Sequence, residues 1–519
     1  MRPASWHPRV LPSPAEQAVL MRSKHAWLFI FLRQQRHVLF TDAFQAELAL
    51  LYRDSRRGQP PVPPAQLALA TILQAYTGVS DDAAIELTTM DRRWQIVLDC
   101  LDATTPPFSN GTLVAFRQAL IARDLDRRLI ERTVEMAATS GLFGSRGLRA
   151  ALDASPLWGA GRGEDPDTLI GHALRKALRV IARQQGRELA TVAAEAGAEI
   201  VAATSLKAAL DLDWDDPQAR VCARTEVLAA LNAVEAWLDG TSPAPMIAAR
   251  LACATRVCVQ DVECAADGTP ALRRGVSKER LISIEDPQMR HGRKSKTPLF
   301  NGYKRQVLHD LASGLVRAVG VTPANRPEAA VTDAVLADRA RQAMLLTEIH
   351  IDRGYLSSGL VQQRPEGLAI YCKAWTIHNG ARFPKTAFVL DWATHQMRCP
   401  AGEVRGFTPG GTVHFPAALC AACPLRPRCT TSSHGRSVTI HPDEQLLAQL
   451  RAHQQTVEGR AQLRERVAVE HTLAQIGQWQ GKRARYRGER KNLFDLRRTA
   501  VVHNLHVIAR TPSTERMAA

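Results

Sequence analysis

The sequence has no long hydrophobic run. Its longest apolar stretch, residues 26–32, is far shorter than the roughly 20 residues with which a helix spans a bilayer, and it is typical of a buried helix. The opening residues, MRPASWHPRV, also lack the apolar segment and cleavage site of a secretory signal. We therefore expect a cytoplasmic protein with no membrane partner.

Acidic residues are few relative to basic ones. The 519 residues include 67 Lys and Arg but only 51 Asp and Glu, which gives a formal charge of +16, and 45% of the residues are hydrophobic. This hydrophobic content is enough for several packed cores and excludes disordered and fibrous classes. The charge surplus points to a polyanionic partner.

The basic residues are concentrated in two segments. From Arg451 onward there are 14 Lys and Arg and 6 Asp and Glu, so this segment holds about half of the net charge. Residues 290–305 add six Lys and Arg and no acid. Such clusters are typical of surfaces that bind a phosphate backbone, although a solvated charged face is the alternative.

Two common ligand-binding loops are missing. Residues 159–166, GAGRGEDP, lack the strand-to-helix context of a nucleotide loop, and their glycines predict a flexible connection. Residues 211–216, DLDWDD, do not match a calcium loop, because Asp216 stands where that loop needs glycine. We interpret Asp215 or Asp216 as the N-cap of a helix that begins near Pro217.

Hydrophobic periodicity predicts an α/β protein with large helical additions. Helical patterns cover the first 140 residues and residues 167–255, and two more helices are predicted at 331–346 and 464–479. Residues 108–120 are compatible with a DNA-binding helix after a turn, and equally with ordinary helix packing. Short apolar runs predict strands at 148–155, 256–263, 280–286, 300–310, 313–325, 347–355 and 368–375. This order indicates a mixed α/β core.

Three carboxylates are candidates for metal chemistry. Asp153 and Asp352 each end an apolar strand, and Glu470 lies among apolar residues in a helical pattern. An acid in such surroundings is costly unless it is paired or binds a cation. If the three converged, they could hold two Mg²⁺ or Mn²⁺ ions about 3.5–4 Å apart, an arrangement that promotes phosphodiester displacement. For any single Asp at a strand end, a cap or turn is the alternative.

Four of the ten cysteines have a metal-ligand spacing. They form a C-x20-C-x2-C-x5-C pattern in turn-rich sequence: Cys399, Cys420, Cys423 and Cys429. Four thiolates can close a tetrahedral zinc shell, with three histidines as alternative ligands, His414, His434 and His441. Four reduced thiols or an iron–sulfur cluster are the other interpretations. In a reducing compartment we expect no disulfide framework and free thiols elsewhere.

Several motifs occur in an order that resembles one family. They are SIEDPQMRHGRKSK (283–296), FNGYKRQVLHD (300–310), GVTPAN (320–325), EIHIDRGY (348–355), CPLRPRC (423–429), VEHTLAQIGQW (469–479) and RYRGERKN (485–492). Together they resemble bacterial insertion-sequence transposases of the DDE type. The resemblance is to the branch with an all-helical N-terminal domain and a cysteine-bearing insert before the catalytic glutamate.

The resemblance implies an RNase H-like catalytic core, a mixed sheet flanked by helices. In that fold the first Asp lies on strand one, the second on strand four and the Glu on a late helix, which corresponds to Asp153, Asp352 and Glu470. Asp286 is the rival for the first acid. The implied domains are a helical N-terminal DNA-binding domain (1–140), the first core strand (141–165), a helical insertion (166–255), the RNase H-like core (256–395), a Cys-rich zinc-binding insert (396–445) and the glutamate helix with a basic C-terminal segment (446–519).

The resemblance also assigns roles to basic residues. Near the carboxylates, phosphate contacts are expected from Arg290, Arg293, Lys294, Lys296 and Lys304. After the glutamate helix they are expected from Lys482, Arg483, Arg485, Tyr486, Arg487 and Lys491. Three of these, Tyr486, Arg487 and Lys491, resemble the family's tyrosine–arginine–lysine signature, which is implied to hold the DNA end. Simple packing is the alternative for Tyr486, and a solvated helix face for the other two.

The function implied by the resemblance is DNA transposition. The protein would bind terminal inverted repeats of double-stranded DNA, cut the 3′ ends with Mg²⁺ and join them to target DNA, as a homodimer or larger assembly because two ends must be held. A catalytically inactive DNA-binding protein of the same fold and a structure-specific nuclease are the alternatives.

Overall fold

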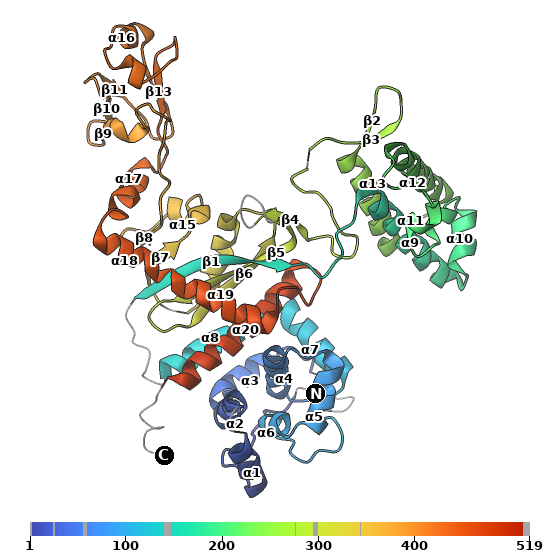
Figure 1. Ribbon diagram of the computed structural model, residues 1–519. Helices are drawn as coiled ribbons and strands as arrows, with labels where there is room; N and C mark the ends of the chain where they lie inside the picture. Colours follow the sequence, from blue (N-terminus) through green and yellow to red (C-terminus); the bar gives the residue numbers. More distant parts are fainter. Residues whose placement is uncertain are drawn as a thin grey trace.

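A central mixed sheet lies among helices in the computed structural model, which describes residues 3–23, 26–54, 60–139, 147–275, 277–293, 299–342 and 344–511 (Figure 1). The sheet has six strands in the order β4-β5-β1-β7-β8, and β6 also pairs with β5, along residues 303–309, which follow the residues that pair with β4. Its strands are β1 (Leu148–Trp158), β4 (Arg290–Arg293), β5 (Leu299–Asp310), β6 (Val316–Pro323), β7 (Leu346–Ile351) and β8 (Ala369–Tyr371). The strands expected near 148, 300, 313, 347 and 368 are therefore confirmed, the last over three residues only.

Strand β1 is the centre of the sheet. It runs antiparallel to β5 and parallel to β7. Residues 150–152 are buried on both faces, as expected for a central strand with an unbroken apolar run. Residues 153–156 are partly exposed, so the first candidate acid lies where the unbroken buried run of β1 ends.

Two helices of the C-terminal region cover the sheet. Helix α19 (Val467–Gln480) packs on β1 and β5, and α20 (Glu489–Arg510) packs on β6. The helix predicted at 464–479 corresponds to α19, but the longer α20 was not predicted. Its interior carries two buried arginines, Arg497 and Arg498, so its sequence looks like an exposed basic segment rather than a core helix.

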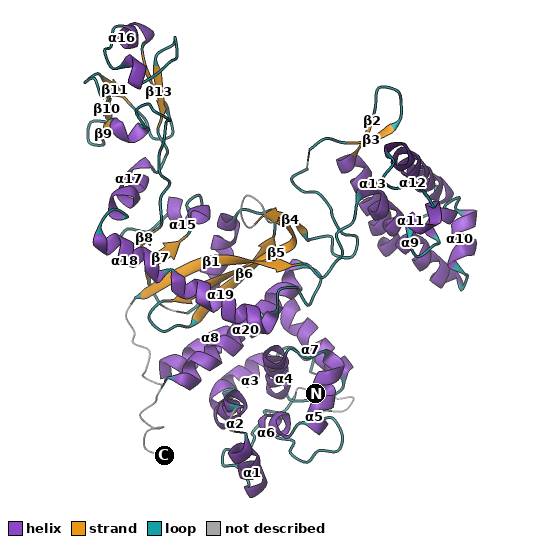
Figure 2. Ribbon diagram, in the orientation of Figure 1, coloured by secondary structure: helices purple, strands orange, loops and turns teal. Residues whose placement is uncertain are grey.

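Helix α20 joins the sheet to the helical N-terminal region. It contacts α4, α7 and α8, and the N-terminal helices share one hydrophobic core with the sheet (Figure 2). The apolar stretch at 26–32 lies in a buried helix there, as predicted. The N-terminal helices are α1 (Pro14–Arg22), α2 (Trp27–Leu39), α3 (Asp42–Ala49), α4 (Pro64–Thr77), α5 (Asp81–Met90), α6 (Arg92–Leu98), α7 (Asn110–Ala122) and α8 (Asp126–Thr139).

A helical insertion follows β1 and has its own hydrophobic core. It comprises α9 (Pro166–Gln185), α10 (Leu189–Glu195), α11 (Leu206–Leu210), α12 (Pro217–Trp237), α13 (Pro245–Asp261) and the hairpin β2 (Val262–Cys264) with β3 (Pro270–Leu272). Asp216 caps α12, as predicted, by accepting from the backbone N–H of Gln218 and Ala219 at 3.0 and 3.2 Å. Figure 1 shows the insertion projecting from one end of the sheet.

Two strands expected next to the insertion are wrong. Residues 256–261 are the end of α13, and no regular element covers 280–286. Valines in residues 256–262 suggested a strand, but Ile247, Ala254 and Val257 bury at helical spacing against the insertion core. Tertiary packing therefore overrides the local β propensity of this segment.

The chain after β7 is mostly short elements. Helix α14 (Thr332–Ala340) is shorter than the helix expected at 331–346 and precedes β7, whereas α15 (Gly359–Gln362) follows it. Helices α17 (Glu444–His453) and α18 (Val457–Glu465) lead into α19. Among the described residues, no helix is long and apolar enough to cross a membrane.

The cysteine-bearing insert forms a separate small unit with its own apolar cluster. It extends away from the sheet beyond α17 (Figure 1). Its elements are β9 (Val389–Asp391), β10 (Gln396–Arg398), β11 (Val404–Gly406), β12 (Thr412–Phe415), α16 (Ala417–Ala421) and β13 (Arg436–Thr439).

Candidate active site

One cavity of about 690 Å³ contains all three predicted catalytic acids. Asp153 reaches it from β1, Asp352 from the first residue after β7, and Glu470 from α19. Asp286, the rival first acid, lies outside this cavity. The polar residues that line the cavity are Asp153, Ser155, Arg293, Lys304, Arg305, Glu328, Asp352, Arg466, Glu470, Gln478 and Lys482.

Asp153 is more enclosed than Glu470, because its side chain is 15% exposed and that of Glu470 is 50% exposed. Burial raises the pKa of its carboxyl, and the nearby charges of Glu470 and Asp352 raise it further. Arg466 and the backbone N–H of Ala154 oppose this shift. The carboxylates therefore repel one another, which is the electrostatic setting that a bound cation relieves.

Arg466 connects two of the acids. Its Nη1 lies 2.6 Å from Asp153 Oδ2, and its Nη2 lies 2.8 Å from Glu470 Oε1. Arg466 precedes α19 by one residue and Glu470 by four, so both side chains point to the same side of the helix. The sequence reasoning missed this arginine, although its i,i+4 spacing to the glutamate was a usable signal.

Asp352 is oriented by the turn that it begins. Its Oδ1 accepts from the backbone N–H of Arg353 at 2.8 Å, and its side chain caps the short 3₁₀ helix at Arg353–Tyr355. Tyr355 in that turn is fully buried, and its hydroxyl has no partner among the described residues. Burial and the charges of Glu328, Asp153 and Asp352 raise the pKa of Tyr355 well above its ordinary value.

Glu328 is a fourth acid in the cavity that sequence reasoning missed. Burial raises its pKa, Lys304 opposes the shift, and Asp153 and Asp352 add to it. The carboxylate lies against Gly354, where a Cβ atom would stand 2.4 Å from Glu328 Oε2. The available signal was position, because Glu328 is the third residue after the GVTPAN motif.

The carboxylates stand too far apart to form one tight single-ion shell. Within the described ranges, only Glu348, His350 and Glu465 have ligand atoms that all lie within 4.8 Å of one another. In that group Arg149 already pairs with Glu348 at 2.9 Å and with Glu465 at 2.6 Å, so its charge is neutralised by the protein. The four acids of the cavity, in contrast, offer carboxylate oxygens, which suit hard divalent cations.

The basic residues predicted to lie near the acids differ in whether their side chains reach the cavity. Arg293, Lys304 and Lys482 line the cavity. Arg290 is buried, and its Nη1 donates to the backbone carbonyls of Pro287 and Met289 at 2.6 and 2.9 Å. Two predicted residues, Lys294 and Lys296, lie outside the described residues.

The segment between α19 and α20 and the first turn of α20 carry exposed basic side chains, Lys482, Arg483, Arg485, Arg487 and Lys491. Arg485 donates to the backbone carbonyl of Val79 at 2.8 Å, which ties the segment to the N-terminal helices. The ring of Tyr486 packs against the guanidinium groups of Arg117 and Arg498, 5.9 and 5.7 Å away, and its hydroxyl is buried.

Part of the basic surplus is used inside the fold. Arg490 pairs with Asp126, Arg497 pairs with Asp124 at 2.6 Å, and Arg498 pairs with Asp495 at 2.6 Å. Arg490 and Arg497 thus join α20 to residues 124–126, and Arg498 also donates to Gln74 of α4 at 2.7 Å, so these three side chains are used inside the fold. The net charge of the C-terminal segment therefore overstates the charge on its surface.

Asp286 links β5 to the residues that precede α20. It is fully buried, and its Oδ1 accepts from the hydroxyl of Tyr303 at 2.6 Å and from the backbone N–H of Gly488 at 3.1 Å. Through these bonds the SIEDPQM loop supports the start of α20.

The four cysteines of the insert line one smaller cavity, of about 220 Å³. Burial raises the pKa of Cys429; Arg436 lowers it, and the other three thiols raise it. Their sulfurs do not reach the 4.8 Å spacing of a preformed metal shell. Of the alternative ligands, His414 Nδ1 lies 2.9 Å from Ser437 Oγ, and His441 Nδ1 accepts from the N–H of Asp443 at 3.0 Å.

Comparison with known protein families gives three matches. Residues 20–119 match a family model described as a transposase domain (DUF772). Residues 261–372 and 405–509 match two models, each described as a transposase DDE domain. The first of these DDE matches contains Asp352 and the second contains Glu470. Searches of curated proteins and of solved structures found no significant match.

Proposed function

Since this chain belongs to the insertion-sequence DDE transposases, which are metal-dependent DNA-cleaving and strand-transfer enzymes, we propose that it binds the terminal inverted repeats of its own element. It cuts the 3′ ends with water and joins each 3′-OH to target DNA. The observation that carries this proposal is that Asp153, Asp352 and Glu470 meet in one cavity from three separate elements.

The strand order supports an RNase H-like core. In chain order its strands would be β1, β5, β6, β7 and β8, arranged in space as β6-β5-β1-β7-β8. The first acid, Asp153, then lies on the first strand, and the second, Asp352, directly follows the fourth. This register favours Asp153 over Asp286 as the first catalytic acid.

The cavity acids would hold two Mg²⁺ or Mn²⁺ ions, with Asp153, Asp352 and Glu470 as ligands. The oxygen donors fit divalent cations, and so does the raised pKa of Asp153, which comes from burial and, to a smaller extent, from the charges of Glu470 and Asp352. Such ions activate an attacking oxygen and stabilise the leaving oxygen of a phosphodiester.

The protein's own groups position the reaction. The backbone N–H of Arg353 donates to the carboxylate of Asp352. Arg466 forms ion pairs with Asp153 and Glu470, and bound cations would replace it as their partner. Lys304 and Lys482 line the same cavity, where they would neutralise the phosphate next to the cut.

The DNA would leave the cavity along the segment that follows α19. Its exposed side chains, Lys482, Arg483, Arg485, Arg487 and Lys491, would contact the backbone of the element end, with Arg293 on the other side. The N-terminal helices (1–140), which this segment touches, would bind the same DNA. Two ends must be held together, so the working assembly would be a homodimer or larger.

The cysteine-bearing insert would bind a structural zinc ion. Cys399, Cys420, Cys423 and Cys429 share one cavity, and burial together with the other three thiols raises the pKa of Cys429. Deprotonation by Zn²⁺ would remove that penalty and draw the four sulfurs into a tetrahedral shell.

The test is cleavage of a plasmid that carries the element's ends, with Mg²⁺ present. We expect Asp352→Asn and Glu470→Gln to abolish both cutting and strand transfer, whereas the exposed Glu458→Gln variant keeps them. Activity in both cavity variants would refute the assignment. DNA binding without cutting by the wild type would identify an inactive copy, and cutting without joined products would identify a nuclease.

A further inference from the structure

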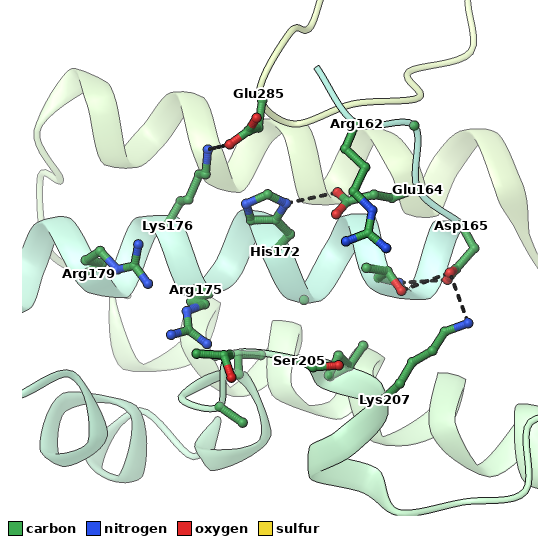
Figure 3. Close-up of a pocket in the computed structure, with 17 residues that line it drawn as sticks. Arg162, Glu164, Asp165, His172, Arg175, Lys176, Arg179, Ser205, Lys207 and Glu285 are labelled. Carbon is green, nitrogen blue, oxygen red and sulfur yellow. Dashed lines mark hydrogen bonds and ion pairs between the residues drawn. The ribbon is translucent and has the colours of Figure 1, made fainter. Parts of the chain in front are cut away.

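A second cavity, of about 550 Å³, lies in the helical insertion between α9 and residues 201–207 (Figure 3). Five Lys and Arg side chains and three acids line it. Figure 3 shows Arg175 and Arg179 on successive turns of α9, with Arg162 at the opposite end of the cavity. Nothing in the proposed chemistry of the carboxylate site uses this cavity.

Each acid at this cavity is already paired. Glu164 Oε2 lies 2.9 Å from His172 Nδ1, and Lys176 Nζ lies 3.4 Å from Glu285 Oε1. Asp165 Oδ2 lies 3.7 Å from the Nζ of Lys207, on α11. The acids are therefore not available to neutralise the remaining arginines.

Three arginines at the cavity have no hydrogen bond or ion pair to any described residue: Arg162, Arg175 and Arg179. The Nη1 atom of Arg175 is buried without a partner, which costs free energy because the donor has lost its water. Arg175 and Arg179 stand at i,i+4 on one helix, a spacing at which like charges destabilise it. Burial lowers the pKa of Arg175, and the charge of Arg179 lowers it further.

We propose that this cavity binds a backbone phosphate of the element-end DNA, and this inference rests on the proposed function. A guanidinium presents a planar fork of donors that matches phosphate oxygens, and an anion in the cavity would offset the unpaired charges of Arg175 and Arg179, which both line it. The missing partner of these arginines is thus supplied from outside the protein.

DNA is the favoured source of the phosphate because the cavity adjoins the proposed DNA path. Glu285 at its rim pairs with Lys176 on one side and with Arg487 on the other, with 2.6 Å between Arg487 Nη2 and Glu285 Oε2. Arg487 belongs to the basic segment that follows α19. One duplex that passes Arg487 would therefore meet the cavity next.

The test compares two full-length double variants of equal charge. Arg175→Gln with Arg179→Gln removes the cavity arginines, and Arg220→Gln with Arg274→Gln removes two exposed arginines elsewhere in the insertion. Binding to a duplex with the terminal repeat is measured over a salt series by fluorescence anisotropy, and melting temperature checks the fold. We expect about tenfold weaker binding and a salt slope lower by about one to two for the cavity variant, and less than threefold change for the control.

A scan with single methylphosphonates locates the contact. Neutralising the phosphate that sits in the cavity should weaken binding by the wild type and by the control variant, but not by the cavity variant. Equal loss in both double variants, or no position with this behaviour, would overturn the inference. Titration of inorganic phosphate distinguishes the other source: tight binding to the wild type with unchanged DNA affinity in the cavity variant would also overturn it.

Failure of this inference and failure of the proposed function give different results. If the wild type cleaves and joins element ends while the cavity variant matches its control, only the phosphate site is wrong. If the wild type neither prefers its ends nor cuts them, the proposed function itself fails.

Discussion

Arg466 donates to Asp153 across 2.6 Å, although the two residues lie 313 positions apart in the chain. Its other terminal nitrogen lies 2.8 Å from Glu470. The guanidinium therefore forms ion pairs with two acids that we propose as metal ligands. This places a cation of the protein in direct competition with the cations of the reaction.

Removal of this arginine should therefore strengthen metal binding. We expect Arg466→Ala to bind Mn²⁺ at least about threefold more tightly in the absence of DNA, because a positive charge no longer repels the metal at contact distance. Calorimetric titration measures the effect, with the exposed Arg464→Ala variant as the control. Unchanged or weaker Mn²⁺ binding by Arg466→Ala would show that the arginine does not compete with the metal.

The raised pKa of Asp153 predicts how stability depends on pH. A carboxyl whose folded pKa lies above its unfolded value near 3.8 favours the folded state at low pH, and this contribution is lost as pH rises through the folded pKa. Without metal, Asp153→Asn should thus melt about 1–3 °C above the wild type at pH 7, and the gap should narrow toward pH 4. Differential scanning fluorimetry over this pH range tests the prediction, with the exposed Asp215→Asn variant as the control for loss of one carboxylate. A gap that widens toward low pH would contradict the prediction.

Gly354 makes room for the carboxylate of Glu328. In Gly354→Ala the added Cβ would stand 2.4 Å from Oε2, so the acid must move within the cavity. We expect at least about tenfold slower DNA cleavage with unchanged DNA binding, because small displacements of groups near the reacting atoms are costly. The matched control is Gly111→Ala, whose Cβ meets its nearest neighbour at an ordinary 3.7 Å. Full activity in Gly354→Ala would mean that the position of Glu328 is unimportant.

Of the basic residues predicted from the sequence, Lys491 and Arg293 should contribute to DNA binding, whereas Arg290 should contribute to stability. Lys491→Gln and Arg293→Gln should each weaken binding to element ends roughly threefold to tenfold and lower the salt slope by about one. Arg290→Gln should mainly lower the melting temperature, since Arg290 is bonded to the backbone of its own loop. Anisotropy and thermal melts test both parts, with Lys278→Gln as the control. Equal loss of DNA binding in the control would point to a general charge effect.

The four cysteines of the insert lead us to predict that the purified protein contains zinc. Purified protein should contain about one zinc per chain by elemental analysis, and Cys423→Ser should lose it together with several degrees of melting temperature. The exposed Cys222→Ser variant should keep its zinc. Zinc-free wild-type protein whose melting is unaffected by a chelator would leave the four residues as reduced thiols.

Local patterns predicted the parts of the fold that depend on neighbours in the chain. The apolar runs before Asp153 and Asp352 became β1 and β7, and Asp216 became the cap of α12, because periodicity and capping act over a few residues. The run at 256–261 joined a helix instead, because contacts within the insertion outweighed its β propensity. The glycines of residues 159–166 pack closely: a Cβ at Gly159 or Gly161 would lie 2.6 Å from neighbouring side chains.

The sequence by itself determined the family, the order of the motifs and the three acids proposed for catalysis, since these are carried by residue types at readable positions. Only the tertiary structure decided which charges remain free. It paired Arg497 and Arg498 inside the fold, put Arg466 between two acids, added Glu328 to the cavity and left Arg175 without a partner. The physical reason is that the availability of a charge depends on burial and on partners hundreds of residues away, which no local pattern encodes.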